Sequence, residues 1–240
     1  MHAPAPDEPV ATLCEKLMRV PTAVVSDVMA AMGIMEQVLA SNIRAVGPPN
    51  SFAGPALCLR GSEGSEPPAM PNGSKPVFEI DRRITRGCVA VIATGGHKIG
   101  AVIGGNVALS WHKHGCAGVV TDGGIRDADE CNEMGLPVFA TFVGPMSNKG
   151  LWAFREIGIP VTLPGQRGQA VLVQPGDIVH ADNDGAVIIP RAYAVQVVGD
   201  AVFLEKMEGR IRQDLERGDD REAVYNRHDR FGHIKKIAAK

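Results

Sequence analysis

Residues 116–142 read CAGVVTDGGIRDADECNEMGLPVFATF, and this stretch decides the expected fold. CAGVVT is a short apolar run, which is typical of a strand buried in a parallel sheet. A glycine turn and a helix follow, and Gly135 ends that helix because glycine readily takes the left-handed conformation of a helix C-terminus. LPVFATF is again a short apolar run. Strand, turn, helix and strand in this order predict an α/β fold with a buried parallel component.

The flanking sequence extends this pattern in both directions. We expect helices over 13–18, 22–33 and 106–115, and strands over 55–60 and 88–93. Pro21 ends the first helix, and Thr22 is the expected N-cap of the second. After residue 159, turn residues separate short β runs, which predicts antiparallel or mixed pairing; the runs are IPVTL, AVLV, DIVHAD and GAVIIP. Residues 190–217 predict a long helix with Pro190 at its start.

The chain of 240 residues is long enough for one sizeable core, and no break in composition demands a second domain. We expect a flexible tail over 1–9, one domain over 10–217 and a charged extension over 218–240. Residues 61–76, GSEGSEPPAMPNGSKP, predict an irregular loop, and loops of this length are often lids or substrate loops.

Charge and composition exclude several classes of protein. Lys and Arg total 25 and Asp and Glu total 27, so the net charge of −2 predicts no nucleic-acid partner. The N-terminus MHAPAPDEP lacks the features of a signal peptide, and no apolar stretch approaches a membrane span. The five cysteines form no C-x-x-C pair and mostly lie in apolar runs, which indicates reduced, buried thiols. We therefore expect a cytoplasmic protein without membrane contact.

The strongest local signal for chemistry is the turn from Asp122 to Asp127, which follows the strand CAGVVT. Open α/β sheets place ligand sites at this point, beyond the carboxyl end of a strand. Arg126 offers a planar donor for a carboxylate, and Asp127 is a hard oxygen ligand for Mg²⁺ or Mn²⁺. A purely structural turn with a surface ion pair at Arg126 is the alternative, and the local sequence leaves both open.

A second glycine turn precedes the helix expected over 106–115. It consists of Gly104, Gly105, Asn106 and Val107, and the N–H groups of such a helix start suit an anion. Alone this is a weak signal. Together, the two turns predict one pocket that holds a small carboxylic acid.

Other motifs favour structural roles. The sequence Asp182-Asn183-Asp184-Gly185 resembles part of a calcium-binding loop. If Gly185 is the sixth position of such a loop, His180 stands at the first position, where an Asp is needed, and Arg191 stands at the twelfth, where a Glu is needed. A tight turn between two strands is the better interpretation. His112 and His114 point to different faces of a helix and make no metal pair. For His97 a core or solvated role is favoured over that of proton donor, and for Asp27 a structural hydrogen bond is favoured over catalysis.

The sequence Gly-Gly-x-Arg-Asp after a strand, with a Gly-x-x-x-Ala helix start before it, resembles the RraA-like family. Its members include metal-dependent 4-hydroxy-4-methyl-2-oxoglutarate / 4-carboxy-4-hydroxy-2-oxoadipate aldolases and the regulator of ribonuclease E activity. The likeness covers about 20–190, and its most specific phrase is Gly-Asp-x-Val-x-x-Asp-x-Asp-Gly-x-Val; the segments that carry it are 22–27, 54–56, 104–108, 123–127 and 175–190.

The resemblance implies a single-domain swivelling β/β/α fold with a mixed sheet and a long C-terminal helix. It also implies a homo-oligomer, either a trimer or a dimer of trimers, with a site between subunits. By position, Arg126 would bind the keto and carboxylate oxygens of a 2-oxo acid substrate, and Asp127 would hold Mg²⁺ or Mn²⁺. The N–H groups of Asn106 and Val107 would bind the pyruvate carboxylate. Gly104 and Gly105 belong to the same substrate-binding turn.

The implied activity is a metal-dependent lyase or aldolase that cleaves a 4-hydroxy-2-oxo acid to pyruvate, with decarboxylation of oxaloacetate as a related reaction. Family aldolases commonly carry an acid where this chain has Gly105. An acid from a neighbouring subunit is also implied, for which Glu205 and Glu208 are candidates. Two alternatives stay open: a non-catalytic ribonuclease regulator, and another hydroxy-acid or keto-acid enzyme on the same scaffold, such as a sugar-acid dehydratase.

Overall fold

Four parallel strands form the centre of the main sheet in the computed structural model, which describes residues 8–48, 51–64, 68, 70 and 72–237. They are β2 (Phe52–Glu63), β3 (Val89–Ala93), β5 (Gly118–Thr121) and β7 (Val138–Ala140). The sheet is mixed, because β1 (Arg44–Ala45), β9 (Trp152–Ile157) and β12 (Ile178–Asp182) pair antiparallel with the central strands, and β13 (Gly185–Ile189) pairs antiparallel with β12.

Both faces of the central strands are covered, which explains their continuous apolar sequences. Ala90 and Ile92 of β3 face the helices α3 (Pro76–Arg83), α4 (Gly105–Lys113) and α5 (Ala128–Met134). Val89 and Val91 face the opposite side, where they pack with the hairpin of β10 (Val161–Pro164) and β11 (Ala170–Val173). The alternation of side chains along a strand therefore builds two separate apolar clusters from one sheet.

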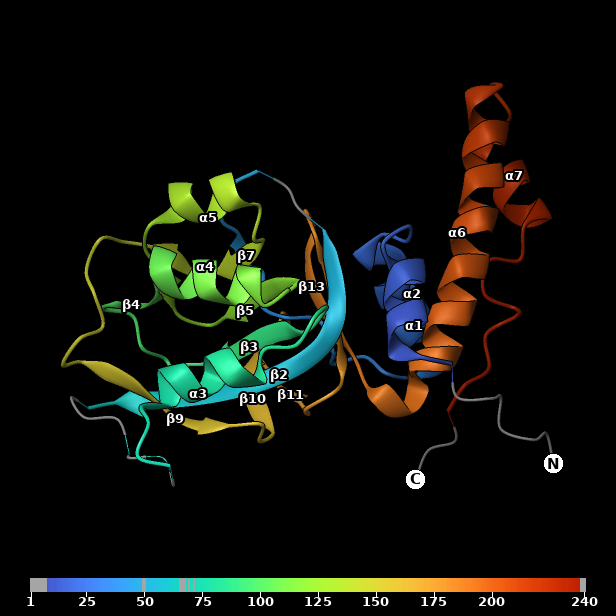
Figure 1. The fold of residues 1–240 in the computed structure, drawn as a ribbon. Coiled ribbons are helices and arrows are strands. Elements are labelled where there is room, and N and C mark those ends of the chain that lie inside the picture. The colour runs from blue at the N-terminus through green and yellow to red at the C-terminus, as the bar shows by residue number, and fades with distance from the viewer. Residues whose placement is uncertain (1–7, 49–50, 65–67, 69, 71, 238–240) are drawn as a thin grey trace.

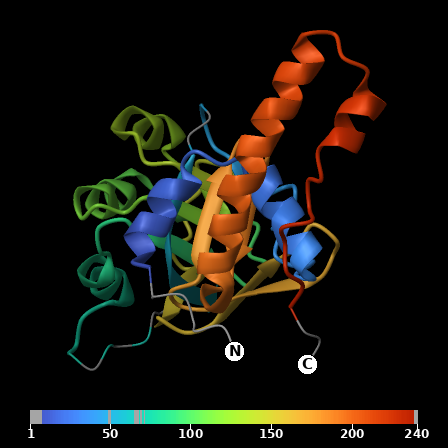
Figure 2. The same ribbon diagram turned by 90° about the vertical axis from the view of Figure 1, so that its right-hand side faces the viewer.

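A third cluster lies beyond the outer strands. There α1 (Val10–Leu17), α2 (Thr22–Met32) and α6 (Ala194–Glu216) pack against β12 and β13. Figure 1 shows these helices on the far side of β2 from α3, α4 and α5, and Figure 2 shows α6 between α1 and α2. The expected α/β architecture with a long C-terminal helix is confirmed.

The central strands continue into a second, smaller parallel sheet. After short bends, β3, β5 and β7 lead to β4 (Ala101–Ile103), β6 (Gly124–Ile125) and β8 (Phe142–Val143), which lie in the order β4-β6-β8. Ala101 pairs with Gly124, and Ile103 pairs with Ile125. This pairing brings the residues that follow β4 next to the residues that follow β6.

The strands after residue 159 form antiparallel pairs, in agreement with the expected antiparallel or mixed pairing, and residues 182–185 make the tight turn between β12 and β13. The expectation that Thr22 is an N-cap is wrong. The N-cap of α2 is Pro21, and Thr22 is the first helical residue. The Asp182 side chain caps the N-terminus of α2 instead. Its carboxylate accepts hydrogen bonds from the N–H (2.7 Å) and the hydroxyl (2.6 Å) of Thr22.

The loop expected over 61–76 is shorter than predicted. β2 continues to Glu63 and α3 begins at Pro76, so both ends of this segment are regular structure. Residues 65–67, 69 and 71 lie outside the described residues. β9 and α3 were not expected from the sequence. Of the tail expected over 1–9, residues 1–7 also lie outside the described residues.

The C-terminal segment folds back along the molecule. A 3-10 turn (Arg191–Tyr193) precedes α6, and α7 (Arg221–Arg227) follows it. The chain then returns toward α2, where the Ile237 N–H donates to the Met32 carbonyl at 2.9 Å. The Arg230 guanidinium lies 3.5 Å from the Asp27 carboxylate, so the two side chains form an ion pair. None of the described helices has the length and apolar character that crossing a membrane requires.

Candidate functional site

The two glycine turns singled out in the sequence meet at one cavity of about 210 Å³. The cavity lies at the carboxyl edge of the small sheet, where β4 leads into α4 and β6 leads into α5. Its lining combines both turns with a loop that follows β8; the lining residues are 101–107, Arg126, Asp127, Glu130, Ser147 and Asn148. We call it the site cavity.

The first turn of α4 presents its backbone N–H groups to the site cavity. The first intrahelical bond of α4 runs from Ala108 to Gly104, so the N–H groups of the three preceding residues have no acceptor inside the helix. The Gly105 N–H donates to Asp127 Oδ2 at 2.9 Å. Asn106 and Val107 also line the cavity, and the free N–H groups of a helix start suit a carboxylate.

Gly104 and Gly105 leave the space that the second turn fills. A Cβ on Gly104 would lie 2.8 Å from Asp127 Oδ2 and 2.9 Å from Arg126 Nε. A Cβ on Gly105 would lie only 1.8 Å from Glu130 Oε2. All three distances are shorter than van der Waals contact, so the two glycines permit the side chains of Arg126, Asp127 and Glu130 to approach the backbone of α4.

Arg126 and Asp127 are held at the end of β6 by an unusual backbone conformation. Asp127 has φ +58°, and it is the only non-glycine residue of the described chain with a positive φ. The Arg126 N–H donates to the Ile103 carbonyl at 3.1 Å, which fastens this turn to the end of β4. The Arg126 Nε lies 3.5 Å from Asp127 Oδ2, and the two side chains are 42% and 37% exposed. Strained residues of this kind concentrate at functional sites.

The structure brings all six predicted site residues to the site cavity: Gly104, Gly105, Asn106, Val107, Arg126 and Asp127. Their roles in binding and catalysis stay predictions. Sequence reasoning missed Glu130, Ser147 and Asn148. The place of Glu130 could have been predicted from its spacing. It lies three residues after Asp127, and residues three apart at a helix share a face. Ser147 and Asn148 gave none, because only the contact of their loop with β4 places them there.

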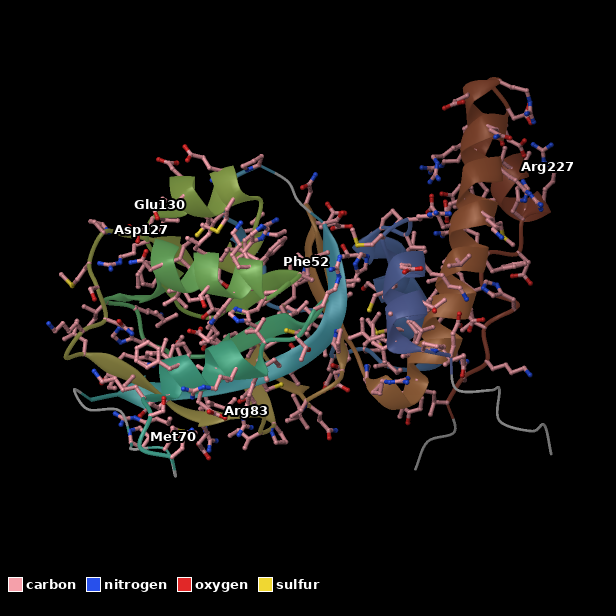
Figure 3. All side chains as sticks on the ribbon, viewed as in Figure 1. Phe52, Met70, Arg83, Asp127, Glu130 and Arg227 are labelled. Atoms are coloured by element: carbon pink, nitrogen blue, oxygen red, sulfur yellow. The ribbon has the colours of Figure 1, made fainter. Side chains whose placement is uncertain are left out.

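The donor groups at the site cavity fit a hydrated divalent cation. Across the described ranges, no three His, Cys, Asp or Glu side chains gather closely enough to hold a metal. Asp127 and Glu130 nevertheless supply two carboxylates at one cavity, and Figure 3 shows both at the same end of the α4 and α5 layer. Mg²⁺ is commonly held by one or two carboxylates with water in the remaining positions. The residues present therefore fit Mg²⁺ or Mn²⁺.

The other candidate residues lie elsewhere. His97 is 2% exposed, and its Nε2 accepts the Gly100 N–H at 3.0 Å, which is a core role. Glu205 pairs with Arg212, and Glu208 pairs with Arg230. Both glutamates belong to α6, which lies across the sheet from α4 and α5 (Figure 1). Within one chain they contribute nothing to the site cavity.

A larger cavity of about 540 Å³ lies where the central strands bend, between the end of β5 and the β10–β11 hairpin. Its most notable group is Asp122, whose Oδ1 accepts the Thr94 N–H at 2.6 Å. Burial raises the pKa of the Asp122 carboxyl, and the hydrogen bonds from Thr94 oppose that shift. Asp122 thus connects the bends after β3 and β5, which is a structural role.

A family model described as Aldolase/RraA matches residues 22–188, which include both glycine turns and the strands that position them. The chain belongs to the RraA-like family. The match covers the main sheet up to β13 and ends before α6.

Two of three similar curated proteins carry an aldolase name, which agrees with the description of the family model. An uncharacterized protein of Methanocaldococcus jannaschii is 34% identical over 52% of this chain and 58% of its own length. A protein of Paraburkholderia phytofirmans named "Putative 4-hydroxy-4-methyl-2-oxoglutarate aldolase" is 38% identical over 44% of this chain and 61% of its own. A Cupriavidus necator protein of the same name is 31% identical over 63% of this chain and 83% of its own length. This chain thus spans about three fifths of the first two relatives.

Solved structures confirm the RraA-like fold over most of the chain. Streptomyces coelicolor RraAS2, described as an unusual member of the RNase ES inhibitor RraA protein family, has a TM-score of 0.74 and is 28% identical, with 86% of this chain and 99% of that chain covered. An uncharacterized Pseudomonas syringae protein has a TM-score of 0.77 at 24% identity, which shows a shared fold alone.

Proposed function

We propose that this RraA-like protein is a Mg²⁺- or Mn²⁺-dependent lyase that cleaves a 4-hydroxy-2-oxo acid and releases pyruvate, and that it also decarboxylates oxaloacetate. The observation that carries this proposal is the meeting of Arg126, Asp127 and the first turn of α4 at one small polar cavity. The names of the Paraburkholderia and Cupriavidus relatives support the substrate class.

The first turn of α4 binds the end of the substrate that becomes the pyruvate carboxylate. Asn106 and Val107 line the cavity, and they belong to the first turn of α4, a nine-residue helix whose free N–H groups and dipole favour an anion at this end. The Gly105 N–H is already bonded to Asp127, so it orients that carboxylate instead of binding substrate.

Arg126 and Asp127 act at the keto group. The Arg126 guanidinium is partly exposed at the cavity, where it places a fixed positive charge beside the substrate's oxygens. Asp127 holds the divalent cation, and its hydrogen bond from Gly105 fixes the direction of the carboxylate. When bound, the cation supplies Lewis acidity to the keto oxygen.

The reaction requires charge stabilisation at the keto oxygen. The 4-hydroxyl gives its proton to water, and the electron pair of its O–H bond forms a new carbonyl at C4 as the C3–C4 bond breaks. The electron pair of the broken bond is delocalised from C3 onto the keto oxygen. Arg126 stabilises the negative charge that develops on this oxygen. A proton added to C3 then gives pyruvate. Oxaloacetate fits the same residues, because loss of carbon dioxide from its C4 leaves the same pyruvate enolate.

The test is a pyruvate-release assay with 4-hydroxy-4-methyl-2-oxoglutarate and with oxaloacetate. We expect EDTA to abolish turnover and added Mg²⁺ or Mn²⁺ to restore it. Asp127→Asn and Arg126→Lys should each lower kcat by about 10²–10³, the range seen when one transition-state donor is removed. Asp129→Asn, at an exposed position in the first turn of α5, is the matched control. Full turnover of Asp127→Asn in EDTA would rule out the metal-dependent mechanism.

A second candidate function is regulation of a ribonuclease without catalysis, which the description of the Streptomyces relative favours. A regulator requires a protein surface and not the chemistry of the site cavity. Inhibition of purified ribonuclease E that is unchanged in Asp127→Asn, together with no pyruvate release from any 4-hydroxy-2-oxo acid, would support this function instead. A third function, dehydration of sugar acids, would be indicated if the protein turned over sugar acids and released no pyruvate from 4-hydroxy-2-oxo acids.

A further inference from the structure

We propose that Glu130 is a second acidic ligand of the site cavity, and that Gly105 is the residue that makes room for it. The proposal rests on the metal-dependent function above. It assigns the holding of the divalent cation to Asp127 and Glu130 together, either directly or through one water molecule.

The first observation is the position of the Glu130 carboxylate. Its Oε2 lies 1.8 Å from the point where a Cβ on residue 105 would be, and its Cδ lies 2.8 Å from that point. The carboxylate therefore occupies the space that a side chain at position 105 would fill. Asp127 Cβ lies 3.4 Å from the same point, which places the two acidic side chains side by side over the start of α4.

The second observation concerns charge. Asp127 has the Arg126 Nε at 3.5 Å and the Gly105 N–H at 2.9 Å. Glu130 is an exposed residue, and within the described residues its carboxylate forms no hydrogen bond or salt bridge. Two neighbouring carboxylates at a cavity that Arg126 only partly neutralises leave a net negative charge there. A divalent cation with oxygen ligands neutralises this charge.

A purely structural role for Glu130 makes a different prediction. If its carboxylate only stabilises the N-terminus of α4 through the helix dipole, Glu130→Gln lowers the free energy of unfolding and leaves metal binding unchanged. If Glu130 holds the cation, the variant loses metal affinity. The measurement must therefore be metal binding, in the absence of substrate.

The experiment is titration of the apo protein with Mn²⁺ alone, followed by calorimetry and by the electron paramagnetic resonance signal of free Mn²⁺. We expect Glu130→Gln to weaken Mn²⁺ binding at least tenfold and Asp129→Asn to leave it unchanged. Asp127→Asn separates the two proposals. Unchanged Mn²⁺ binding in Asp127→Asn overturns the proposed metal-dependent function, whereas loss in Asp127→Asn with unchanged binding in Glu130→Gln overturns only the role of Glu130.

Gly105→Ala is an independent test that leaves Glu130 in place. The added methyl group meets the far end of a flexible side chain, so the Glu130 carboxylate moves while the backbone of α4 stays. We expect Gly105→Ala to weaken Mn²⁺ binding in the wild-type background but to have no further effect in Glu130→Gln. In Glu130→Ala, the added substitution Gly105→Glu should restore binding, since it returns a carboxylate to the same space. Additive effects of Gly105→Ala and Glu130→Gln would overturn the proposal.

Discussion

Asp122 and Asp127 lie five residues apart on the same turn, yet their environments differ. Asp127 is 37% exposed at the site cavity, whereas Asp122 is directed back toward Thr94 and its carboxyl pKa is raised by burial. A carboxyl with a raised pKa in the folded state binds its proton more tightly there than in the unfolded chain. Asp122 therefore favours folding at low pH, and this contribution is lost as pH rises from the unfolded pKa through the folded one.

The variant Asp122→Asn tests this difference, because the amide keeps an acceptor for the Thr94 N–H and removes the buried charge. We expect its free energy of unfolding, relative to wild type, to increase from about pH 3.5 to pH 7, since the unfolded pKa of Asp is about 3.9. Urea unfolding at several pH values measures this. A difference between the two proteins that stays constant with pH would contradict the prediction.

Individual residues differ in whether their role could be predicted from the local sequence. Arg126 and Asp127 were found from their place after a strand, which is a local property. Glu130 was missed because the position of its carboxylate depends on the approach of α5 to α4, which no local pattern contains. Thr22 was misassigned for the same reason: the group that caps α2 is Asp182, which lies 160 residues away.

At the scale of elements, strands with continuous apolar runs were predictable and very short strands were not. β3 and β5 are runs of buried residues and follow the expected ranges closely. β6 and β8 contain two residues each, which is too short for any periodicity. These short strands nevertheless determine the site, because the pairing of β4 with β6 joins the two turns.

Gly100, just before β4, is a position where backbone atoms leave no space for a side chain. A Cβ there would lie 2.7 Å from the Ser147 carbonyl oxygen and 2.8 Å from Asn148 Cα, both rigid backbone atoms. We expect Gly100→Ala to lower the free energy of unfolding by about 1–3 kcal/mol. Pyruvate release should fall as well, because Ser147 and Asn148 line the site cavity.

The matched control is Gly199→Ala in α6, where an added Cβ meets nothing within 4 Å. A glycine inside a helix costs about 0.5–1 kcal/mol relative to alanine, so this variant should be more stable by that amount. Urea unfolding and the pyruvate assay on both variants measure the difference. Equal stability of Gly100→Ala and wild type would mean that the loop at 147–148 moves freely.

At the scale of the whole molecule, three exposed apolar side chains lie close to the small sheet that carries the site cavity. Ile99, Val143 and Met146 are 57%, 53% and 55% exposed, and all three lie on or next to the small sheet. Exposed apolar side chains in one region indicate a surface that a partner covers. We propose that a second copy of the chain covers it, in the trimer or dimer of trimers that the family resemblance implies.

Light scattering after size-exclusion chromatography tests this assembly. We expect a mass three or six times that of the chain for wild type. Val143→Asp should reduce the mass to that of one chain and lower pyruvate release, because a charge buried in an apolar contact is strongly unfavourable. Leu172→Asp, an exposed position on β11, is the control. A monomeric wild-type protein with full activity would contradict the prediction.

The parallel pairing of β4 with β6 also has a consequence for engineering. The pairing of β4 with β6 sets which residues of the two turns lie next to each other, while Gly104 and Gly105 set how closely the charged side chains approach α4. Positions 105 and 130 can then be randomised as a pair without redesigning the scaffold. A library would vary the length and charge of these two side chains and which of the two positions carries the acid. It would sample new substrate preferences while the rest of the fold stays constant.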